Sequence, residues 1–556
     1  MNRRNLLTGA LALASTGALA ETKPETPSPT GPFETATVRR LAAALSRQPY
    51  AAPDTRLPAA IDHVTYDQYG GIRFKPERAL WAGQKRPFTA EFFPRAAIYR
   101  ARVDIFEVAE GQARPVPYSP DLFEYADPTL RVPDAVGFAG LRLRTPLNRP
   151  DVYDEVCVFL GASYFRAVGR NQLYGLSARG LAIATGNSRG EEFPRFTAFW
   201  LETPAPGVNA IVVHALLDSP STTGAYRFTI RPGETTVFDV ESVLYPRTDI
   251  PEPGIAPLTS MYVFDTKDAR RFDDWRPAVH DSDGLAITNG RGEQLWRPLA
   301  NPLDLQISAF TDASPRGFGL MQRNHTFAAY QDLQVNYERR PSGWVEPIGD
   351  WSQGAVTLVE IPTANETNDN IVAFWRPRDK LVAHGEYTYT YRLHWGTDRP
   401  NPGPLARVAT TRSGAGEQPG TRVFVIDFTG DTVKNLPPTP APASISATPP
   451  APSAPSSPFP TPKPAAGASP SAWTRPGQSS SKCTATSPTT KAPLPRRGST
   501  AGRRDPFCVA TWATGRPARS RPGGDSGSAS AQPAARIPPR HAQPGAGANP
   551  PRRPGP

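Results

Sequence analysis

The clearest pattern along the chain is a series of short apolar or alternating runs bounded by Gly, Pro, Asn or Asp. These runs begin at Ala210, Tyr226, Val356 and Arg422, and they are rich in β-branched and aromatic residues, which favour strands. In residues 387–391 Tyr and Thr alternate strictly, which places three rings on one face of a strand and two threonines on the other. Many such strands and few helical patterns predict an all-β, antiparallel sandwich.

The runs also divide the chain. A short helix is predicted over 37–47, where Val38, Leu41 and Leu45 recur with helical spacing. No proline-rich break interrupts residues 21–396, so we expect one large β domain there. A proline-rich linker occupies 397–404, and 405–434 contains two further strand patterns. From 435 to 556 Pro, Ala, Ser, Gly and Arg dominate, and we expect disorder because this composition buries too little apolar surface to offset the ordering entropy.

Charge changes this picture because it is concentrated in the tail. The 556-residue chain has a net charge of +11, but residues 435–556 contain 15 Lys and Arg against two acidic residues. The rest of the chain carries 47 basic and 49 acidic residues, so it lacks the excess of positive charge that a nucleic-acid-binding body needs. Cys157 is the only cysteine ahead of the tail, which excludes a disulfide framework and a cysteine-ligated zinc site there.

The N-terminus has the form of an export signal. Arg3-Arg4 precede a mild apolar stretch that ends at Ala18-Leu19-Ala20, so we expect residues 1–20 to be removed after Ala20. The paired arginines favour the twin-arginine route, and an ordinary secretory signal is the alternative. No later segment reaches the roughly 20 apolar residues of a membrane span. We therefore expect a soluble protein that works outside the cytoplasm.

Carboxylates, arginines and aromatic residues are interleaved from Phe272 to Trp375. Flat rings can stack on sugars, polar side chains can bind hydroxyls, and two carboxyl groups can act as acid and base in glycoside cleavage. The alternative is that the rings are sandwich core and the charges a solvated rim. Asp281-Ser-Asp283-Gly284 begins like a calcium loop, but the later ligands of that loop do not follow, so we expect neither metal nor cofactor.

Several colinear blocks resemble the periplasmic glucan biosynthesis protein family, types G and D, over roughly residues 60 to 430. The matching blocks are Tyr66-Asp-Gln-Tyr-Gly-Gly-Ile-Arg-Phe, Leu160-Gly-Ala-Ser-Tyr-Phe-Arg-Ala, Tyr174-Gly-Leu-Ser-Ala-Arg-Gly-Leu-Ala-Ile, Trp275-Arg-Pro-Ala-Val-His-Asp-Ser-Asp-Gly-Leu, Leu295-Trp-Arg-Pro-Leu, Arg316-Gly-Phe-Gly-Leu-Met-Gln-Arg, Arg339-Arg-Pro-Ser-Gly-Trp-Val-Glu-Pro and Leu358-Val-Glu-Ile-Pro-Thr. The resemblance implies a large galactose-mutarotase-like β-sandwich followed by an immunoglobulin-like domain. Because type D members resemble twin-arginine substrates, Arg3-Arg4 favours type D.

The resemblance also implies a site and an activity. Members of the family cleave β-1,2-glucan internally with inversion, and their motifs place the general base at Asp281 and the general acid at Asp369. Tyr337 matches the position of a proton relay, and Glu366 that of a residue that tunes the acid or contacts substrate. Further candidate substrate-binding residues are Asp283, Arg340, Trp296, Trp344 and Trp351, with a core role as the alternative for the three tryptophans.

We therefore expect a periplasmic glycoside hydrolase with β-glucan polysaccharide as its partner. The membrane glucan synthase machinery is a further candidate partner, while nucleic acid is not expected. The alternatives are a transglycosylase and a non-catalytic glucan-binding or scaffolding protein. Family members continue past the strand at Arg422 into a complete immunoglobulin-like domain, but here the tail replaces it. We interpret this as a shifted reading frame near residue 435, with a genuine cationic extension as the alternative.

Overall fold

The computed structural model describes residues 28–134, 136–403, 405–415, 421–431, 445–446 and 507–513. The expected export signal at 1–20 and most of the expected disordered tail lie outside these residues. The chain divides into two compact units, with the boundary between Asp398 and Arg399, inside the predicted linker.

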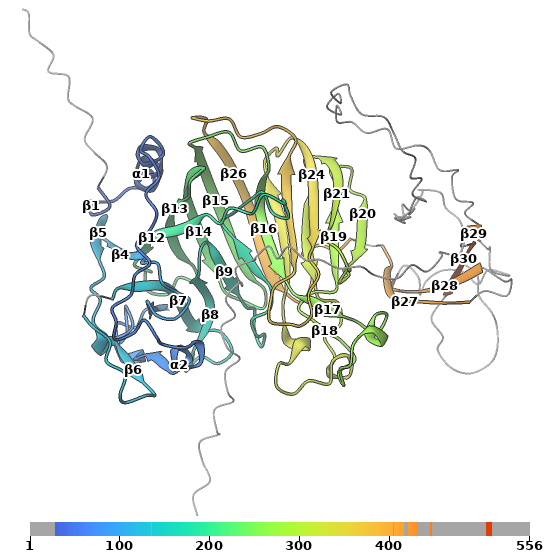
Figure 1. Ribbon diagram of the computed structural model, residues 1–556, viewed down its shortest axis with the longest axis horizontal. Helices are drawn as coiled ribbons and strands as arrows, with labels where there is room; N and C mark the ends of the chain where they lie inside the picture. Colours follow the sequence, from blue (N-terminus) through green and yellow to red (C-terminus); the bar gives the residue numbers. More distant parts are fainter. Residues whose placement is uncertain are drawn as a thin grey trace, which may run out of the picture. The chain divides into compact units, whose positions relative to one another are not determined.

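The first unit is built from two large sheets (Figure 1). In spatial order, the 12-stranded sheet contains β1 (Gly31–Pro32), β5 (Gln112–Pro115), β4 (Asp104–Ala109), β12 (Arg195–Glu202), β13 (Ile211–Asp218), β14 (Thr222–Arg231), β15 (Thr236–Pro246), β26 (Tyr387–Gly396), β23 (Ser342–Ile348), β22 (Gly317–Met321), β19 (Gly284–Thr288) and β20 (Gln294–Pro298). The 10-stranded sheet contains β21 (Gln306–Ala313), β24 (Gln353–Glu360), β25 (Ile371–Pro377), β16 (Pro253–Ser260), β10 (Ser177–Arg179), β9 (Tyr164–Ala167), β8 (Tyr153–Leu160), β7 (Phe138–Pro146) and β3 (Thr89–Pro94), with β11 (Leu181–Ile183) also on β16.

Smaller elements complete this unit. Two ribbons pair β2 (Ile72–Phe74) with β6 (Phe123–Tyr125), and β17 (Tyr262–Phe264) with β18 (Val279–His280). The α-helices among the described residues are α1 (Thr37–Ser46) and α2 (Tyr66–Gly70). Short 3₁₀ helices are η1 (Pro76–Arg78), η2 (Pro120–Leu122), η3 (Ala269–Arg271), η4 (Phe327–Ala329) and η5 (Tyr337–Arg339).

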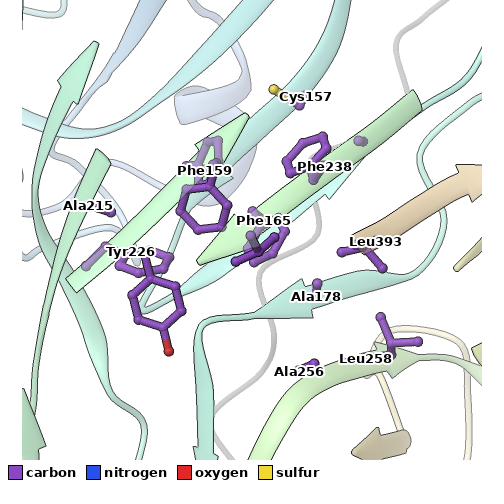
Figure 2. Packing of buried hydrophobic residues seen from close by; sticks show 14 of the residues in the cluster. Cys157, Phe159, Phe165, Ala178, Ala215, Tyr226, Phe238, Ala256, Leu258 and Leu393 are labelled. Atoms are coloured by element: carbon purple, nitrogen blue, oxygen red, sulfur yellow. The ribbon is translucent and has the colours of Figure 1, made fainter. Parts of the chain in front are cut away.

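Aromatic side chains from both sheets meet in the core between them (Figure 2). Phe159 and Phe165 come from the 10-stranded sheet, and their ring centroids are 5.4 Å apart. Phe238, from the 12-stranded sheet, stacks on Phe165 at 5.8 Å. Each ring removes a large apolar area from water, which is the main term that stabilises a two-layer packing. The fold is therefore an all-β sandwich, as predicted; its galactose-mutarotase-like assignment stays a prediction.

The local predictions can be compared with these elements. The helix expected over 37–47 is confirmed as α1, and the strands expected from 210, 226, 356 and 422 are confirmed as β13, β14, β24 and β28 (Thr421–Thr429). The alternation in 387–391 is confirmed in β26, where Tyr391 is 2% exposed and Tyr387 and Tyr389 pack against the core. Thr388 on the other face is exposed.

The second unit contains the two strands expected in 405–434, β27 (Arg407–Ala415) and β28, which pair antiparallel. Two strands of the expected disordered segment join them: β30 (Phe507–Ala513) pairs with β28, and β29 (Ile445–Ser446) pairs with β30. These pairings differ from the disorder expected for this segment. The expectation of disorder stays a prediction for the remaining residues of that segment.

Candidate active site

Asp281 follows directly after β18, and its side chain is 2% exposed. Its backbone N–H donates to the Met261 carbonyl at 2.8 Å, which fixes it beside the chain between β16 and β17. The guanidinium of Arg340 donates to Asp281 Oδ1 and lies 4.5 Å from the centroid of the Tyr337 ring. A buried cation stabilises the charged form of a carboxylate. This geometry therefore suits a group that acts as a base.

Asp369 lies in the connection between β24 and β25, and its side chain is 3% exposed. Arg166 of β9 donates from Nη2 to Asp369 Oδ2 at 3.4 Å. Tyr164, two residues earlier on β9, has a raised pKa, chiefly because of burial, with further contributions from the negative charges of Glu191 and Asp369. The candidate acid thus lies near β9 of the 10-stranded sheet, and Arg166 is one of its partners.

A single chain segment connects the two carboxylates. Met261 binds the backbone of Asp281, and the next residue, Tyr262, is held by Asn370, the neighbour of Asp369. The Asn370 side chain accepts from Tyr262 N at 2.8 Å and donates to Tyr262 O at 3.0 Å. The backbone of Asp281 and the side chain of Asn370 therefore contact two consecutive residues, which places the chain around both candidate carboxylates in one region of the fold.

Glu366 is bound to Arg276 at 2.8 Å. Arg276 also contacts Asp274 at 2.7 Å and Asp332 at 3.2 Å, so one cation joins three carboxylates. The pKa of Arg276 is raised, first by its hydrogen bond with Asp274 and further by the charges of Glu366 and Tyr337. We expected Glu366 to raise the proton affinity of Asp369 as a like-charged neighbour, but here its charge is compensated by a cation. Its role as a substrate contact stays a prediction.

Asp283 forms a second polar group with Arg323. Arg323 donates to Asp283 from Nε at 3.2 Å and from its backbone N–H at 3.3 Å. The guanidinium of Arg323 covers the half-buried Trp296, 4.0 Å from the ring centroid. Arg323 therefore joins Asp283 to Trp296, and this arrangement is compatible with one substrate-binding region. The guanidinium of Arg323 itself occupies one face of the Trp296 ring.

The other two candidate tryptophans are core residues. Trp344 is 4% exposed and packs with Ala286 and Met321, and a Cβ at Gly317 would lie 2.3 Å from its ring. Trp351 is also 4% exposed, lies in the main core, and donates from Nε1 to the Thr390 carbonyl at 3.3 Å. A sugar cannot stack on a ring that protein atoms already cover. The platform interpretation of Trp344 and Trp351 is thus corrected to the alternative, a core role.

Sequence reasoning missed Gln322, whose side chain is completely buried. Its Nε2 donates to the carbonyls of His280 and Tyr337 at 3.1 and 3.3 Å. Its Oε1 must then accept the 2.8 Å hydrogen bond from His280 Nδ1. Burial lowers the pKa of His280, which keeps the ring neutral and suits this donor role. The amide therefore links the strand of the candidate base to the helix of the candidate relay.

Arg166 and Arg276 were missed for a different reason. Each lies inside a block that carried the family resemblance, Arg166 in the one that starts at Leu160 and Arg276 in the one that starts at Trp275. Their position in these blocks was the available signal. Only the fold brings Arg166 to Asp369, 203 positions away in the sequence.

In the part of the chain that the structure describes, no group of three or more His, Cys, Asp or Glu side chains is arranged to hold a metal ion. The same residues include no helix that is both long and apolar enough to cross a membrane.

Comparison with known proteins identifies the family. The family model described as periplasmic glucan biosynthesis protein, MdoG, matches residues 33–454. The chain belongs to this family. The glucans biosynthesis protein G of Bradyrhizobium diazoefficiens is 56% identical over 440 residues, 79% of this chain and 87% of that protein. The protein of the same name from Vibrio cholerae serotype O1 is 51% identical over 406 residues, 72% of this chain and 74% of that protein.

These names refine one expectation and leave others unchanged. Both relatives are named type G, whereas the paired arginines favoured type D. Among solved structures, a GH36 alpha-galactosidase from Geobacillus stearothermophilus aligns with a TM-score of 0.24 and 7% identity, over 46% of this chain and 39% of that one. A likeness at this level carries no argument about fold or activity.

Proposed function

We propose that the chain acts in the periplasm in glucan biosynthesis, by cleaving β-1,2-glucan internally with inversion of configuration. Membership of the periplasmic glucan biosynthesis family supports the glucan role and the location. One structural observation supports the catalytic proposal: two buried carboxylates belong to Asp281, whose backbone N–H binds Met261, and to Asp369, whose neighbour Asn370 binds the adjacent Tyr262. The polysaccharide is the substrate, and the membrane glucan synthase machinery is the predicted partner.

In this mechanism Asp369 gives its proton to the glycosidic oxygen while the bond from that oxygen to the anomeric carbon breaks. A water molecule attacks the same carbon from the opposite face, and its proton passes to Asp281. Tyr337 lies under Arg340, beside the base, where its hydroxyl can relay that proton. The products are a shortened glucan with an inverted reducing end and a new non-reducing end.

The arginine partners of the two carboxylates favour the base role of one and oppose the acid role of the other. Arg340 donates to Asp281 Oδ1, and a hydrogen bond from a cation favours the carboxylate form that a base requires. Arg166 stabilises the charged form of Asp369, whereas an acid must carry a proton before it transfers one. The bound glucan must therefore weaken the contact between Arg166 and Asp369.

A non-catalytic glucan-binding or scaffolding role is the second candidate. The observation that favours it is that both carboxylates are already paired with arginines, an arrangement that a purely structural ion pair would also have. A transglycosylase is a third candidate, since the same carboxylates could transfer the glucan to a sugar hydroxyl in place of water.

The deciding experiment incubates linear β-1,2-glucan with the purified wild-type protein and with Asp369→Asn. We expect the wild type to release shorter oligosaccharides and the variant to lose activity about 10²–10⁴-fold, the usual contribution of a general acid. Asp379→Asn is the matched control, because the Asp379 side chain is 84% exposed and forms an ion pair with the neighbouring Arg378.

Each result separates the candidates. Equal oligosaccharide release by wild type and Asp369→Asn would exclude the catalytic assignment. Binding of glucan without any cleavage would favour the scaffold, and products longer than the substrate would favour the transglycosylase.

A further inference from the structure

Trp275 differs from the tryptophans singled out by sequence reasoning because its ring is turned to solvent. It is 74% exposed, whereas Trp344 and Trp351 are each 4% exposed. Isolated exposed apolar side chains are common on proteins. A large, rigid indole left so open is nevertheless a costly surface group, and its surroundings indicate what it could bind.

The backbone that carries this ring is held firmly by the next residue. Arg276 donates to Asp274 from Nε at 3.0 Å, from Nη2 at 2.7 Å and from its backbone N–H at 2.9 Å. Its Nη1 contacts Asp332 at 3.2 Å and Glu366 at 2.8 Å. These contacts come from three separate chain segments, so the turn is fixed before any ligand arrives. A pre-organised contact residue reduces the entropy cost of binding.

These contacts also place the ring beside the candidate active site. Glu366 belongs to the same connection between β24 and β25 as Asp369, and Arg276 joins it to the Trp275 turn. The guanidinium of Arg276 lies 5.9 Å from the Trp275 ring centroid, so a cation that is bound to Asp274 and Glu366 stands beside the exposed indole.

An apolar face bordered by donors and acceptors matches the chemistry of a pyranose ring. A β-linked glucosyl residue presents flat C–H faces and a rim of hydroxyl groups. Its C–H face can cover the indole, while its hydroxyls can reach Asp274, Arg276 or Glu366. The acyl chain of a lipid would use the apolar face but would leave the neighbouring polar side chains without matching partners.

We propose that Trp275 forms a glucosyl-stacking subsite at the border of the carboxylate pair, which binds a sugar residue of the glucan outside the cleaved linkage. This proposal rests on the proposed function, because it takes the glucan as substrate. Binding energy from such a remote residue orients the chain at the reacting bond. A second copy of the protein is the competing occupant of the exposed ring.

The test measures binding of linear β-1,2-gluco-oligosaccharides by calorimetry in the Asp369→Asn protein, so that the ligand is not consumed. We expect Trp275→Ala to weaken binding about tenfold, the loss of one good aromatic contact. Trp275→Phe, which keeps a flat ring, should stay within about threefold of the parent. Val382→Ala is the control, because Val382 is a 48%-exposed apolar residue in the turn before β26. All three variants should melt at the temperature of the parent.

The outcomes separate this proposal from the proposed function. If the parent binds glucan and Trp275→Ala binds it equally well, the subsite is overturned while the glucan function stands. If the parent does not bind glucan at all, both are overturned. If Trp275→Ala leaves sugar binding unchanged but shifts the sedimentation coefficient, the ring contacts a second copy and the subsite is again overturned.

Discussion

Each of the two candidate catalytic carboxylates forms an ion pair with an arginine. Asp281 and Asp369 are almost inaccessible to solvent, and each contacts a guanidinium that comes from a different part of the chain. A buried charge that loses its partner is strongly destabilising, whereas removal of both partners restores much of the loss. The pair of Asp281 and Arg340 allows this to be tested, because the side chain of Arg340 is itself only 10% exposed.

We predict that Arg340→Met lowers the free energy of unfolding by about 3 kcal/mol, since it leaves the Asp281 carboxylate buried and unpaired. The double variant Asp281→Asn, Arg340→Met should recover most of this loss, because the charge is then absent. Urea denaturation monitored by circular dichroism measures both. If the double variant is less stable than Arg340→Met alone, the ion pair is not the source of the effect.

At the same scale, sequence reasoning found the carboxylates but assigned the tryptophans less well. Asp281 and Asp369 lie in recognisable motifs, so their importance is visible without the fold. Whether a tryptophan faces solvent depends on strands distant in sequence: Trp351 packs against Tyr389 and Tyr391 of β26. No local pattern around Trp351 contains that information. For the same reason, the sequence alone did not distinguish the exposed Trp275 as a candidate substrate contact.

At the scale of elements, side-chain amides hold the irregular segments of the site in register. Asn370 is 2% exposed, and its side-chain amide binds both the backbone N–H and the carbonyl of Tyr262. The same amide also donates to Ile361 O at 2.9 Å. The pairing of β25 with β16 and β24 begins at Ile371, so these amide contacts extend the connection between the strands by one residue beyond the sheet. They fix where Asp369 lies relative to the segment that holds Asp281.

We predict that Asn370→Asp lowers kcat on β-1,2-glucan by about 10- to 100-fold with a smaller change in KM, because misplacing a reacting group mainly affects the transition state. The aspartate side chain has nearly the same volume as that of asparagine. It replaces the Nδ2 group, which donates to the carbonyls of Tyr262 and Ile361, with an oxygen that can only accept. Thr236→Val is the control. Thr236 lies on β15, outside the site, and the substitution removes the buried hydrogen bond that its hydroxyl donates to Val168 O. Equal losses of kcat in both variants would indicate a general effect on stability.

The strands themselves were easier to predict than these connections. Alternation in β26 and the β-branched runs of β13, β14 and β24 are local signals that follow from burial of one face. The clamp by Asn370 and the pairing of β30 with β28 join residues far apart in sequence. Such contacts depend on the final arrangement of the chain, so propensity alone could not predict them.

At the scale of the whole molecule, the charge of the chain lies apart from its candidate chemistry. Residues 435–556 carry 15 of the 62 basic residues and only two acidic ones, while the site lies in the near-neutral part. The family match extends to residue 454, past the point where the composition changes. The relatives nonetheless retain a further part that this chain does not match.

We predict that a reading frame other than the one translated encodes a strand-rich continuation downstream of Asn435. GC-rich coding DNA read out of frame yields Pro, Ala, Arg, Gly and Ser, the residues that dominate the tail. Translation of the other two frames of the gene checks this directly. Absence of a strand-rich segment from both frames would instead support a genuine cationic extension.

The central claim is that Asp369 and Asp281 act as acid and base on opposite faces of a β-1,2-linked glucan. Proton NMR during the first minutes of the reaction reports the configuration of the newly formed reducing end. If the reaction inverts, the α-anomer accumulates first and the β-anomer appears only through mutarotation. Initial formation of the β-anomer, or no cleavage by the wild-type protein, would contradict it.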